Sequence, residues 1–407
     1  MTRTGAMSKK VLHVLTCTVM ACLLTGMKAQ THGHADNLVA SLLTCSPGTE
    51  IYQYYGHSAL RIRNTENDAD FVFNYGIFDF SQPHFIWRFV LGNTDYCMAT
   101  SPTAHFLNAY QQRGSAVREL VLDLSQEEIR RMVDSLTAIE RQPGWTYRYN
   151  FFCDNCATRI RDQIAACLDG KLEYTTQEKA QTLRNIVHQY SEGYDWSLFG
   201  QDLLIGAAAD TLASRTLQQF APIVLEEDLR LAVIQDSTGK YRPLVKTENV
   251  LVAQGNLQKE KGFPLSPLAC CMIWLALALV LSIWDFARRK ASWGFDFLML
   301  VLQGLAGCLI AFMVFFSKHP TVNNNWLIAI FNPLPLLLLF HVIRQERNRK
   351  KCMYHEGARW WYMLFLCATP FIPQYIGTEV ILLALSLFTR SMSYHLLAAY
   401  RFPHHRT

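Results

Sequence analysis

This 407-residue sequence lacks the motifs that mark most metal and nucleotide enzymes. It contains no H-E-x-x-H and no pair of C-x-x-C motifs, which would indicate zinc, and no G-x-x-x-x-G-K loop for phosphates. No basic face carrying stacked aromatic residues is indicated either, which disfavours nucleic-acid binding. We therefore expect no metal site, no cofactor and no nucleic-acid partner.

Acidic residues are scarce outside the middle of the chain. Residues 31–262 contain 21 Lys and Arg and 28 Asp and Glu, whereas the remaining segments contain 17 basic and only 5 acidic residues. The net charge of +5 is therefore typical of basic loops beside membrane spans rather than of a nucleic-acid-binding surface. This asymmetry predicts an aqueous half followed by a membrane half.

The first 29 residues have the pattern of a secretory signal peptide. Lys9 and Lys10 precede an apolar run over residues 11–24, which small and polar residues follow. The run is short for a retained membrane helix, so we expect cleavage near Ala29. An alternative is that the marginal lipobox ending at Cys22 directs lipidation of this protein itself.

Apolar stretches alternate with basic loops after Gly262. Five stretches are candidate membrane spans, at residues 268–286, 295–316, 326–343, 360–374 and 376–399. The basic loops are expected in the cytoplasm together with the C-terminus, so residues 31–262 and the loop 317–325 are expected in the periplasm. Arg390, in the last span, is expected to extend toward the cytoplasmic surface.

One stretch combines an aromatic run with a polar helix start, at residues 151–162. Asp154 or Asn155 is a natural N-cap, and apolar residues recur at helical spacing from Ile160, so Cys156 falls in the first turn. The unpaired amides there lower the pKa of a thiol and offer hydrogen-bond donors to a developing oxyanion. A small packed cysteine is the alternative interpretation, and Cys156 alone does not decide between the two.

A second stretch supplies a candidate base. His57 begins a strand whose apolar residues alternate through Ile62, and residues 71–76 predict a returning strand that places Asn74 beside His57. A thiolate nucleophile needs a base, and the base needs a third group that holds its ring. We therefore predict Cys156, His57 and Asn74 as catalytic residues. Asp79 is an alternative third group, and a strand histidine is often merely hydrogen-bonded.

Two blocks in combination resemble the Lnb family, bacterial lipoprotein N-acyltransferases of the inner membrane. They are residues 55–61, Tyr-Gly-His-Ser-Ala-Leu-Arg, and residues 154–162, Asp-Asn-Cys-Ala-Thr-Arg-Ile-Arg-Asp. Further similar segments lie at 74–80, 203–206, 317–320, 325–326 and 332–333, so the resemblance covers nearly the whole chain. It implies an α+β fold, similar to circularly permuted papain-like (NlpC-type) enzymes, followed by an α-helical bundle of about five spans.

The resemblance implies transfer of an acyl chain from a membrane phospholipid to the α-amine of diacylglyceryl-cysteine in a lipoprotein, through a thioester on Cys156. Substrate contacts are then expected from Asn155, Arg159, His319 and Asn325. Arg159 lies on the same helical face as Cys156, although an ion pair with a local carboxylate such as Asp162 is equally compatible. Capping of a polar loop is the alternative role of His319 and Asn325.

These expectations divide the chain into four parts: a signal peptide at 1–29, a periplasmic Cys–His core at 30–175, a helical extension at 176–262 and a transmembrane domain at 263–407. In the core, residues 116–122 predict a strand, and the segment 124–128 predicts the capped start of a helix toward Ile139. In the extension, helices are expected at 176–190 and 198–220, the second ended by Pro222.

Cysteine usage leaves other functions open. Five cysteines fall in the expected periplasmic part, an odd number that leaves at least one thiol free; they are Cys45, Cys97, Cys153, Cys156 and Cys167. Cys153 and Cys156 form a C-x-x-C pair, but the βαβ pattern of a thioredoxin-like site is missing. The alternative functions are a membrane-bound cysteine hydrolase, either a phospholipase or an amidase or peptidase, and a non-catalytic membrane scaffold.

Overall fold

The computed structural model describes residues 37–401 apart from residue 80, residues 177–178 and residues 258–261. The expected signal peptide at 1–29 and Cys22 lie outside the described residues. The chain divides into two units at Asn37, and the second, Leu38–Thr407, contains all the elements below.

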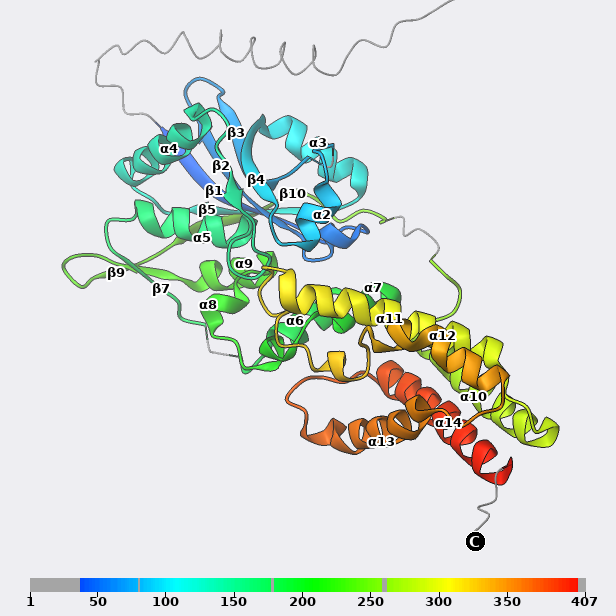
Figure 1. The fold of residues 1–407 in the computed structure, drawn as a ribbon. Helices are drawn as coiled ribbons and strands as arrows, with labels where there is room; N and C mark the ends of the chain where they lie inside the picture. The colour runs from blue at the N-terminus through cyan, green and yellow to red at the C-terminus, as the bar shows by residue number, and fades with distance from the viewer. Residues whose placement is uncertain (1–36, 80, 177–178, 258–261, 402–407) are drawn as a thin grey trace, which may run out of the picture. The chain divides into compact units, whose positions relative to one another are not determined.

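A seven-stranded antiparallel sheet forms the frame of the first half of this unit (Figure 1). Its strand order is β10-β5-β1-β2-β3-β4-β6. The bounds are β1 Leu38–Cys45, β2 His57–Asn64, β3 Asp70–Ile77, β4 Asp95–Pro102, β5 Val117–Leu122, β6 Tyr147–Arg148 and β10 Val245–Val252. The strands predicted at 71–76 and 116–122 are confirmed as β3 and β5, and β2 begins at His57 as predicted.

Helices cover both faces of this sheet. α4 (Gln126–Arg141), α5 (Cys156–Cys167) and α9 (Pro222–Leu231) pack on one face, against side chains such as Leu42 and Leu60. α3 (Thr103–Arg113) packs on the other face, against the alternate residues of the same strands. Residues 40–45 of β1 are all buried, because helices cover both faces of the strand.

The segment after residue 175 differs from the predicted helical extension. The helix expected at 176–190 is the shorter α6 (Leu183–Tyr190), and the one expected at 198–220 is broken into α7 (Asp195–Leu204), the 3-10 turn η2 (Ala207–Asp210) and α8 (Arg215–Gln218). The break falls at Gly206, where an added Cβ would lie 2.4 Å from the carbonyl oxygen of Asn324, so only glycine fits.

Pro222 begins α9 instead of ending the preceding helix. It occupies the first helical turn, where the missing N–H costs no hydrogen bond. β8 (Val233–Gln235) then pairs with β7 (Lys171–Glu173) on one side and with β9 (Tyr241–Pro243) on the other, and β10 returns to the edge of the main sheet beside β5. The last part of the expected helical extension therefore belongs to the same sheet as the Cys–His core.

After β10 the described residues form five long helices: α10 Pro267–Arg288, α11 Trp293–Phe316, α12 Leu334–Arg347, α13 Met353–Ala368 and α14 Thr378–Arg401. Among the described residues, four helices are long and apolar enough to cross a membrane, at Pro267–Arg288, Trp293–Phe316, Trp326–Arg347 and Thr378–Tyr400. The span expected at 360–374 is not among them, because α13 ends at Ala368 and a 3-10 turn containing Pro370 follows. The count of five spans stays a prediction.

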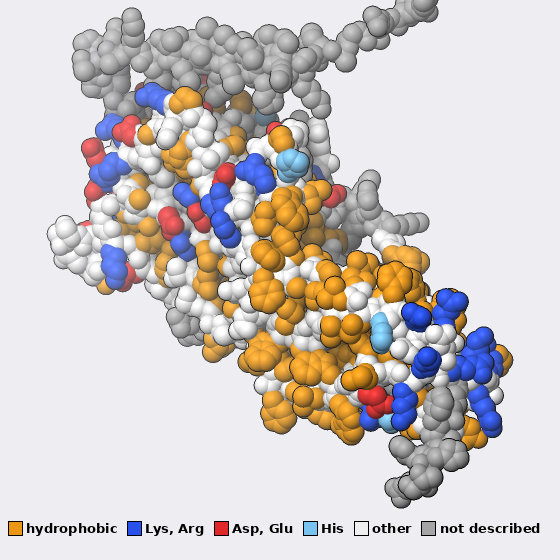
Figure 2. Space-filling model, in the orientation of Figure 1, with side chains coloured by type: hydrophobic (Ala, Val, Ile, Leu, Met, Phe, Trp, Pro, Cys, Tyr) orange, Lys and Arg blue, Asp and Glu red, His pale blue; other side chains and the backbone are white. Residues whose placement is uncertain are grey.

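Charge and apolar surface are separated along these helices. Figure 2 shows hydrophobic side chains over the helices. Lys and Arg gather at the end of the helices farthest from the seven-stranded sheet, where the basic loops join α10 to α11 and α12 to α13. The orientation in which these basic loops face the cytoplasm stays a prediction.

Arg390 does not extend toward the surface, contrary to the sequence expectation. Its side chain is 2% exposed and makes ion pairs with Asp285 of α10 and Asp296 of α11, at 2.8 and 2.7 Å, while it also donates to Ser282. Two carboxylates from neighbouring helices outweigh the gain from hydration, so the guanidinium joins α10, α11 and α14.

Candidate active site

Cys156 is the first residue of α5, and Asn155 caps this helix. The Asn155 side-chain oxygen accepts hydrogen bonds from the backbone N–H groups of Ala157 and Thr158, at 2.9 and 3.0 Å. The Thr158 hydroxyl accepts one from the N–H of Asn155 in return, which completes a capping box. The cap therefore fixes the position of the half-buried Cys156.

All hydrogen-bonding groups of the Asn155 side chain have partners within the protein, and the residue is 3% exposed. Its amide nitrogen donates to the carbonyl oxygens of Phe151 and Phe220, at 3.0 and 2.8 Å, while its oxygen serves the helix cap. No hydrogen-bonding group is left for a substrate. The structure thus gives Asn155 a capping role, in place of the substrate contact expected from the sequence.

His57 and Asn74 meet across adjacent strands, as the sequence predicted. His57 begins β2, Asn74 lies in β3, and the imidazole Nε2 is 2.9 Å from the Asn74 side-chain oxygen. Because a side-chain carbonyl accepts, Nε2–H donates and Nδ1 is left to act on a neighbouring thiol. That neighbour is Cys156, since the thiol and the ring shift each other's pKa.

The electrostatics of this pair favour a thiolate. Burial opposes ionisation of Cys156, but His57 and the backbone of Ser58 and Ala157 outweigh it and lower the pKa of the thiol. Burial likewise opposes the imidazolium, whereas Cys156 and then Asn74 raise the pKa of His57. By contrast, burial and the charge of Asp154 raise the pKa of the Cys153 thiol, so Cys156 is the better nucleophile.

Gly76 leaves space open beside Cys156. It is the extra residue of a β-bulge between the pairs Tyr75–Met98 and Ile77–Cys97, and its φ of +89° is one that glycine adopts readily. A Cβ at this position would lie 3.7 Å from the Cβ of Cys156 and 3.9 Å from the hydroxyl oxygen of Tyr147. The sequence analysis did not identify this glycine as part of the site.

The Tyr147 hydroxyl faces the same space and was also missed. The side chain is 6% exposed, and its hydroxyl has no hydrogen-bond partner among the residues that the structure describes. A buried hydroxyl without a partner is costly, so it marks a place where a ligand group would be favoured. The only available signal was its position in the aromatic run just before the cysteine helix.

Comparison with protein-family models matches residues 27–189 to the Lnb N-terminal periplasmic domain and residues 258–401 to the Lnb transmembrane domain. The chain belongs to the Lnb family. Comparison with curated proteins and with solved structures found no match. The likeness to permuted papain-like enzymes therefore stays a prediction, whereas a membrane protein with a periplasmic portion follows from the two Lnb domains.

Arg159 of the Lnb periplasmic domain is paired with Asp154. Its Nη2 lies 2.6 Å from Asp154, and its guanidinium lies over the Tyr147 ring, 4.3 Å from the ring centre. Asp162, the partner considered from the sequence, pairs with Arg161 instead. Arg159 therefore borders the site beside Tyr147, and contact with a lipid phosphate stays a prediction.

His319 and Asn325 of the Lnb transmembrane domain are not brought to Cys156 by any contact among the described residues. His319 Nε2 is 2.6 Å from the carbonyl oxygen of Phe89, and the 4%-exposed Asn325 donates to the carbonyl of Leu203 at 2.8 Å. The Asn325 oxygen caps the turn at Leu327. Both residues join the loop after α11 to the periplasmic domain, which corresponds to the capping alternative for Asn325.

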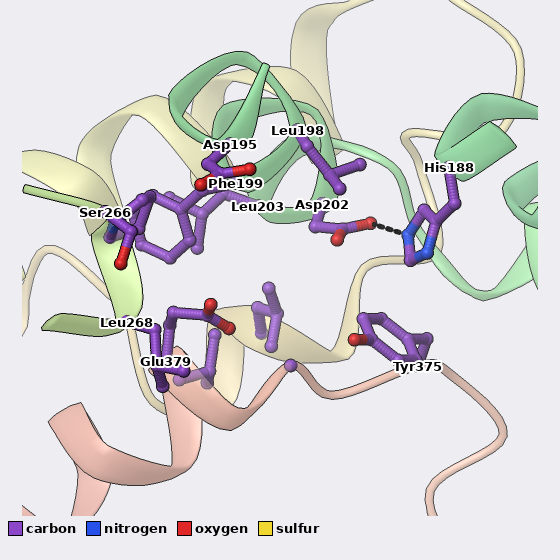
Figure 3. Close-up of a pocket in the computed structure, with 14 residues that line it drawn as sticks. His188, Asp195, Leu198, Phe199, Asp202, Leu203, Ser266, Leu268, Tyr375 and Glu379 are labelled. Atoms are coloured by element: carbon purple, nitrogen blue, oxygen red, sulfur yellow. Dashed lines mark hydrogen bonds and ion pairs between the residues drawn. The ribbon is translucent and has the colours of Figure 1, made fainter. Parts of the chain in front are cut away.

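A separate pocket of about 270 Å³ lies between α6 and α7 on one side and α10 and α14 on the other (Figure 3). His188 of α6, Asp202 of α7 and Glu379 of α14 line it, with Leu268 and other apolar side chains between them. Asp202 is neutralised by Arg184 at 2.7 Å and also contacts His188 at 2.9 Å. Neither Cys156 nor His57 lines this pocket, so it is separate from the candidate reaction centre.

Proposed function

We propose that this protein is a lipoprotein N-acyltransferase, which moves an acyl chain from a membrane phospholipid to the α-amine of diacylglyceryl-cysteine. The observation that carries the proposal is the contact of Cys156 with a histidine that Asn74 orients, at the capped start of α5. Membership of the Lnb family supports an acyltransferase working at the membrane. In this proposal the basic loops and the C-terminus lie in the cytoplasm, and the membrane is a bacterial inner membrane.

In the first step, the Cys156 thiolate attacks an ester carbonyl of the phospholipid. The bond between sulfur and the carbonyl carbon forms, and the carbonyl oxygen becomes an oxyanion. When this intermediate collapses, the C–O bond breaks and protonated His57 gives its proton to the departing glycerol oxygen. A lysophospholipid leaves, and the acyl chain remains on Cys156 as a thioester.

In the second step, the α-amine of the lipoprotein cysteine attacks the thioester carbonyl. His57, now neutral, takes the proton that the amine loses, and the C–S bond breaks to release the Cys156 thiolate. The N-acylated lipoprotein then leaves and the Cys156–His57 pair is restored. An ester is exchanged for an amide overall, which is downhill, so the reaction requires no nucleotide.

Tyr147 is proposed to stabilise the oxyanion of both steps. Its buried hydroxyl and the Cβ of Cys156 flank the same space over Gly76, and a donor without a competing partner is already desolvated. Asn74 holds the histidine ring through the 2.9 Å hydrogen bond to Nε2.

The deciding experiment compares the N-terminal lipopeptide mass of a reporter lipoprotein from cells that carry this protein, lack it, or carry Cys156→Ala. Cys153→Ala is the matched control, because it removes the exposed thiol three residues away. The proposal expects a mass higher by one acyl chain with the unmodified protein and with Cys153→Ala only. Equal masses in all four strains would reject it, and released fatty acid would then favour the hydrolase alternative.

A further inference from the structure

α2 (Phe85–Val90) is a short helix of the periplasmic domain whose apolar side chains do not face its core. Ile86, Trp87 and Phe89 are 77%, 56% and 44% exposed, and α2 has no buried residue. The charged residue of the helix, Arg88, turns back to Gln82 and Asp95, at 3.0 and 3.4 Å. The outer face of α2 is therefore apolar, which is unusual for a surface in contact with water.

This face lies where α11 ends. Trp87 contacts Phe312 in the last turns of α11, with ring centroids 4.9 Å apart. The loop after α11 is joined to α2 by three hydrogen bonds: Ser317 Oγ to the carbonyl of Val90 at 2.8 Å, the Lys318 N–H to Leu91 at 2.9 Å, and His319 to Phe89.

Gly92 permits this close approach. Its φ is +70°, and an added Cβ would lie 2.9 Å from the backbone nitrogen of His319 and 3.0 Å from the carbonyl carbon of Lys318. No side chain fits between the backbone at Gly92 and the backbone at residues 318–319, so the end of α2 is held next to the end of α11.

The end of α11 is the expected boundary of the bilayer, since α11 is long and apolar enough to cross it. Its 24 residues span about 36 Å, enough to cross the hydrocarbon layer, and Phe315 and Phe316 in its last turn are 69% and 66% exposed. Figure 2 shows the hydrophobic surface of the spanning helices continuing to the region where Figure 1 places α2. The apolar face of α2 is thus continuous with the surface that lipid covers.

Aromatic side chains connect this face with the neighbourhood of Cys156. Phe89 stacks on Phe85 at 6.3 Å, and Phe85 stacks on Phe78 at 5.7 Å between centroids. Phe78 contacts Tyr96 at 5.0 Å, and both Phe78 and Cys156 pack against the same core cluster. These contacts form a continuous apolar row from α2 to the core cluster against which Cys156 packs.

We propose that α2 inserts Ile86, Trp87 and Phe89 into the periplasmic leaflet of the membrane and forms the entrance by which a phospholipid acyl chain reaches Cys156. The insertion is independent of the reaction, whereas the entrance rests on the proposed function. The partner of this face is lipid, because the face is continuous with α11 and carries no outward charge.

The first test places a photoreactive benzoylphenylalanine at position 87 of the full-length protein in cells. Tyr241 of β9 is the matched negative control, since it is 58% exposed against 56% for Trp87, and Phe315 in α11 is the positive control. Phospholipid adducts at positions 87 and 315 but not at 241 are expected. Adducts to a protein at position 87, or no lipid adduct there while position 315 reacts, would overturn the proposal.

The second test measures transfer kinetics with the purified full-length protein in phospholipid vesicles. Ile86→Ser combined with Phe89→Ser should raise the KM for the vesicle phospholipid about tenfold, because two apolar contacts with the acyl chain are lost. The rate at which iodoacetamide alkylates Cys156 should not change, which separates lipid entry from damage to the site. Tyr241→Ser is the control.

An unchanged KM in the double variant would overturn the entrance. If vesicles and lipoproteins give no transfer with the unmodified protein, the proposed function fails, while the photo-crosslink at position 87 still decides whether α2 inserts into the membrane. The failure of one proposal is thereby distinguished from the failure of the other.

Discussion

Replacing Gly76 with alanine tests whether substrate approaches Cys156 through the β-bulge. The new methyl group would lie 3.7 Å from the Cβ of Cys156 and 3.9 Å from the Tyr147 hydroxyl, which is ordinary van der Waals contact, so it fits without moving its neighbours. The unfavourable φ of +89° costs about 1–2 kcal/mol. We expect a small loss of stability and a loss of acyl transfer of roughly a hundredfold, because the methyl occupies the place of the reacting carbonyl.

Gly239→Ala provides the matched control for backbone strain. Gly239 has a φ of +82° in the turn between β8 and β9, and no described atom lies within 4 Å of an added Cβ. Both variants should lower the melting temperature of the detergent-solubilised protein by a few degrees, about 2–4 °C for each kcal/mol. Only Gly76→Ala should lose transfer to a reporter lipopeptide, which mass spectrometry measures.

Two results would refute this reasoning. Full transfer activity in Gly76→Ala would mean that the acyl donor does not pass over this glycine. A much larger fall in melting temperature for Gly76→Ala than for Gly239→Ala would mean that the space over Cys156 is not open, and the assignment of Tyr147 would then fail with it.

Three further substitutions address charge and hydrogen bonding. His57→Ala removes the main group that lowers the pKa of Cys156 while burial remains, so the midpoint of Cys156 alkylation by iodoacetamide should move to higher pH. An unchanged pH profile would exclude an ion pair between the Cys156 thiolate and the His57 imidazolium. Tyr147→Phe should lower kcat about a hundredfold and leave the melting temperature unchanged, since the hydroxyl has no partner among the described residues; equal kcat would remove it from the oxyanion site. Arg390→Met should destabilise the helices by about 3–5 kcal/mol, because the carboxylates of Asp285 and Asp296 lose their cation. Adding Asp296→Asn should restore part of the melting temperature, and an Arg390→Met variant as stable as the parent would contradict the buried pairing.

Local sequence signals predicted the parts of the site that depend on neighbouring residues. The start of α5 was readable because Asn155 is a preferred cap, and β2 and β3 because their apolar residues alternate. Two strands joined by a short loop are adjacent, so the contact of His57 with Asn74 followed from their order in the chain. The spanning helices at 268–286 and 295–316 were similarly evident from length and composition.

Contacts between distant segments were not readable in this way. β10 pairs with β5 more than a hundred residues earlier, and no local pattern distinguishes this edge strand from one in a separate domain. Asn155 was assigned to substrate because the sequence does not show that Phe220 takes its second amide hydrogen. Burial of Arg390 is not predictable from its own span, because its partners, Asp285 and Asp296, lie in two other helices.

The sequence by itself therefore predicted a periplasmic domain with a candidate Cys–His pair, joined to apolar helices, since caps, strand alternation and span length are local properties of the chain. The tertiary structure decided how that domain packs against the apolar helices and what surrounds Cys156. The bulge at Gly76, the unpartnered Tyr147 hydroxyl and the outward apolar face of α2 all arise from packing between elements far apart in sequence. Such packing depends on which surfaces meet, and no single segment encodes it.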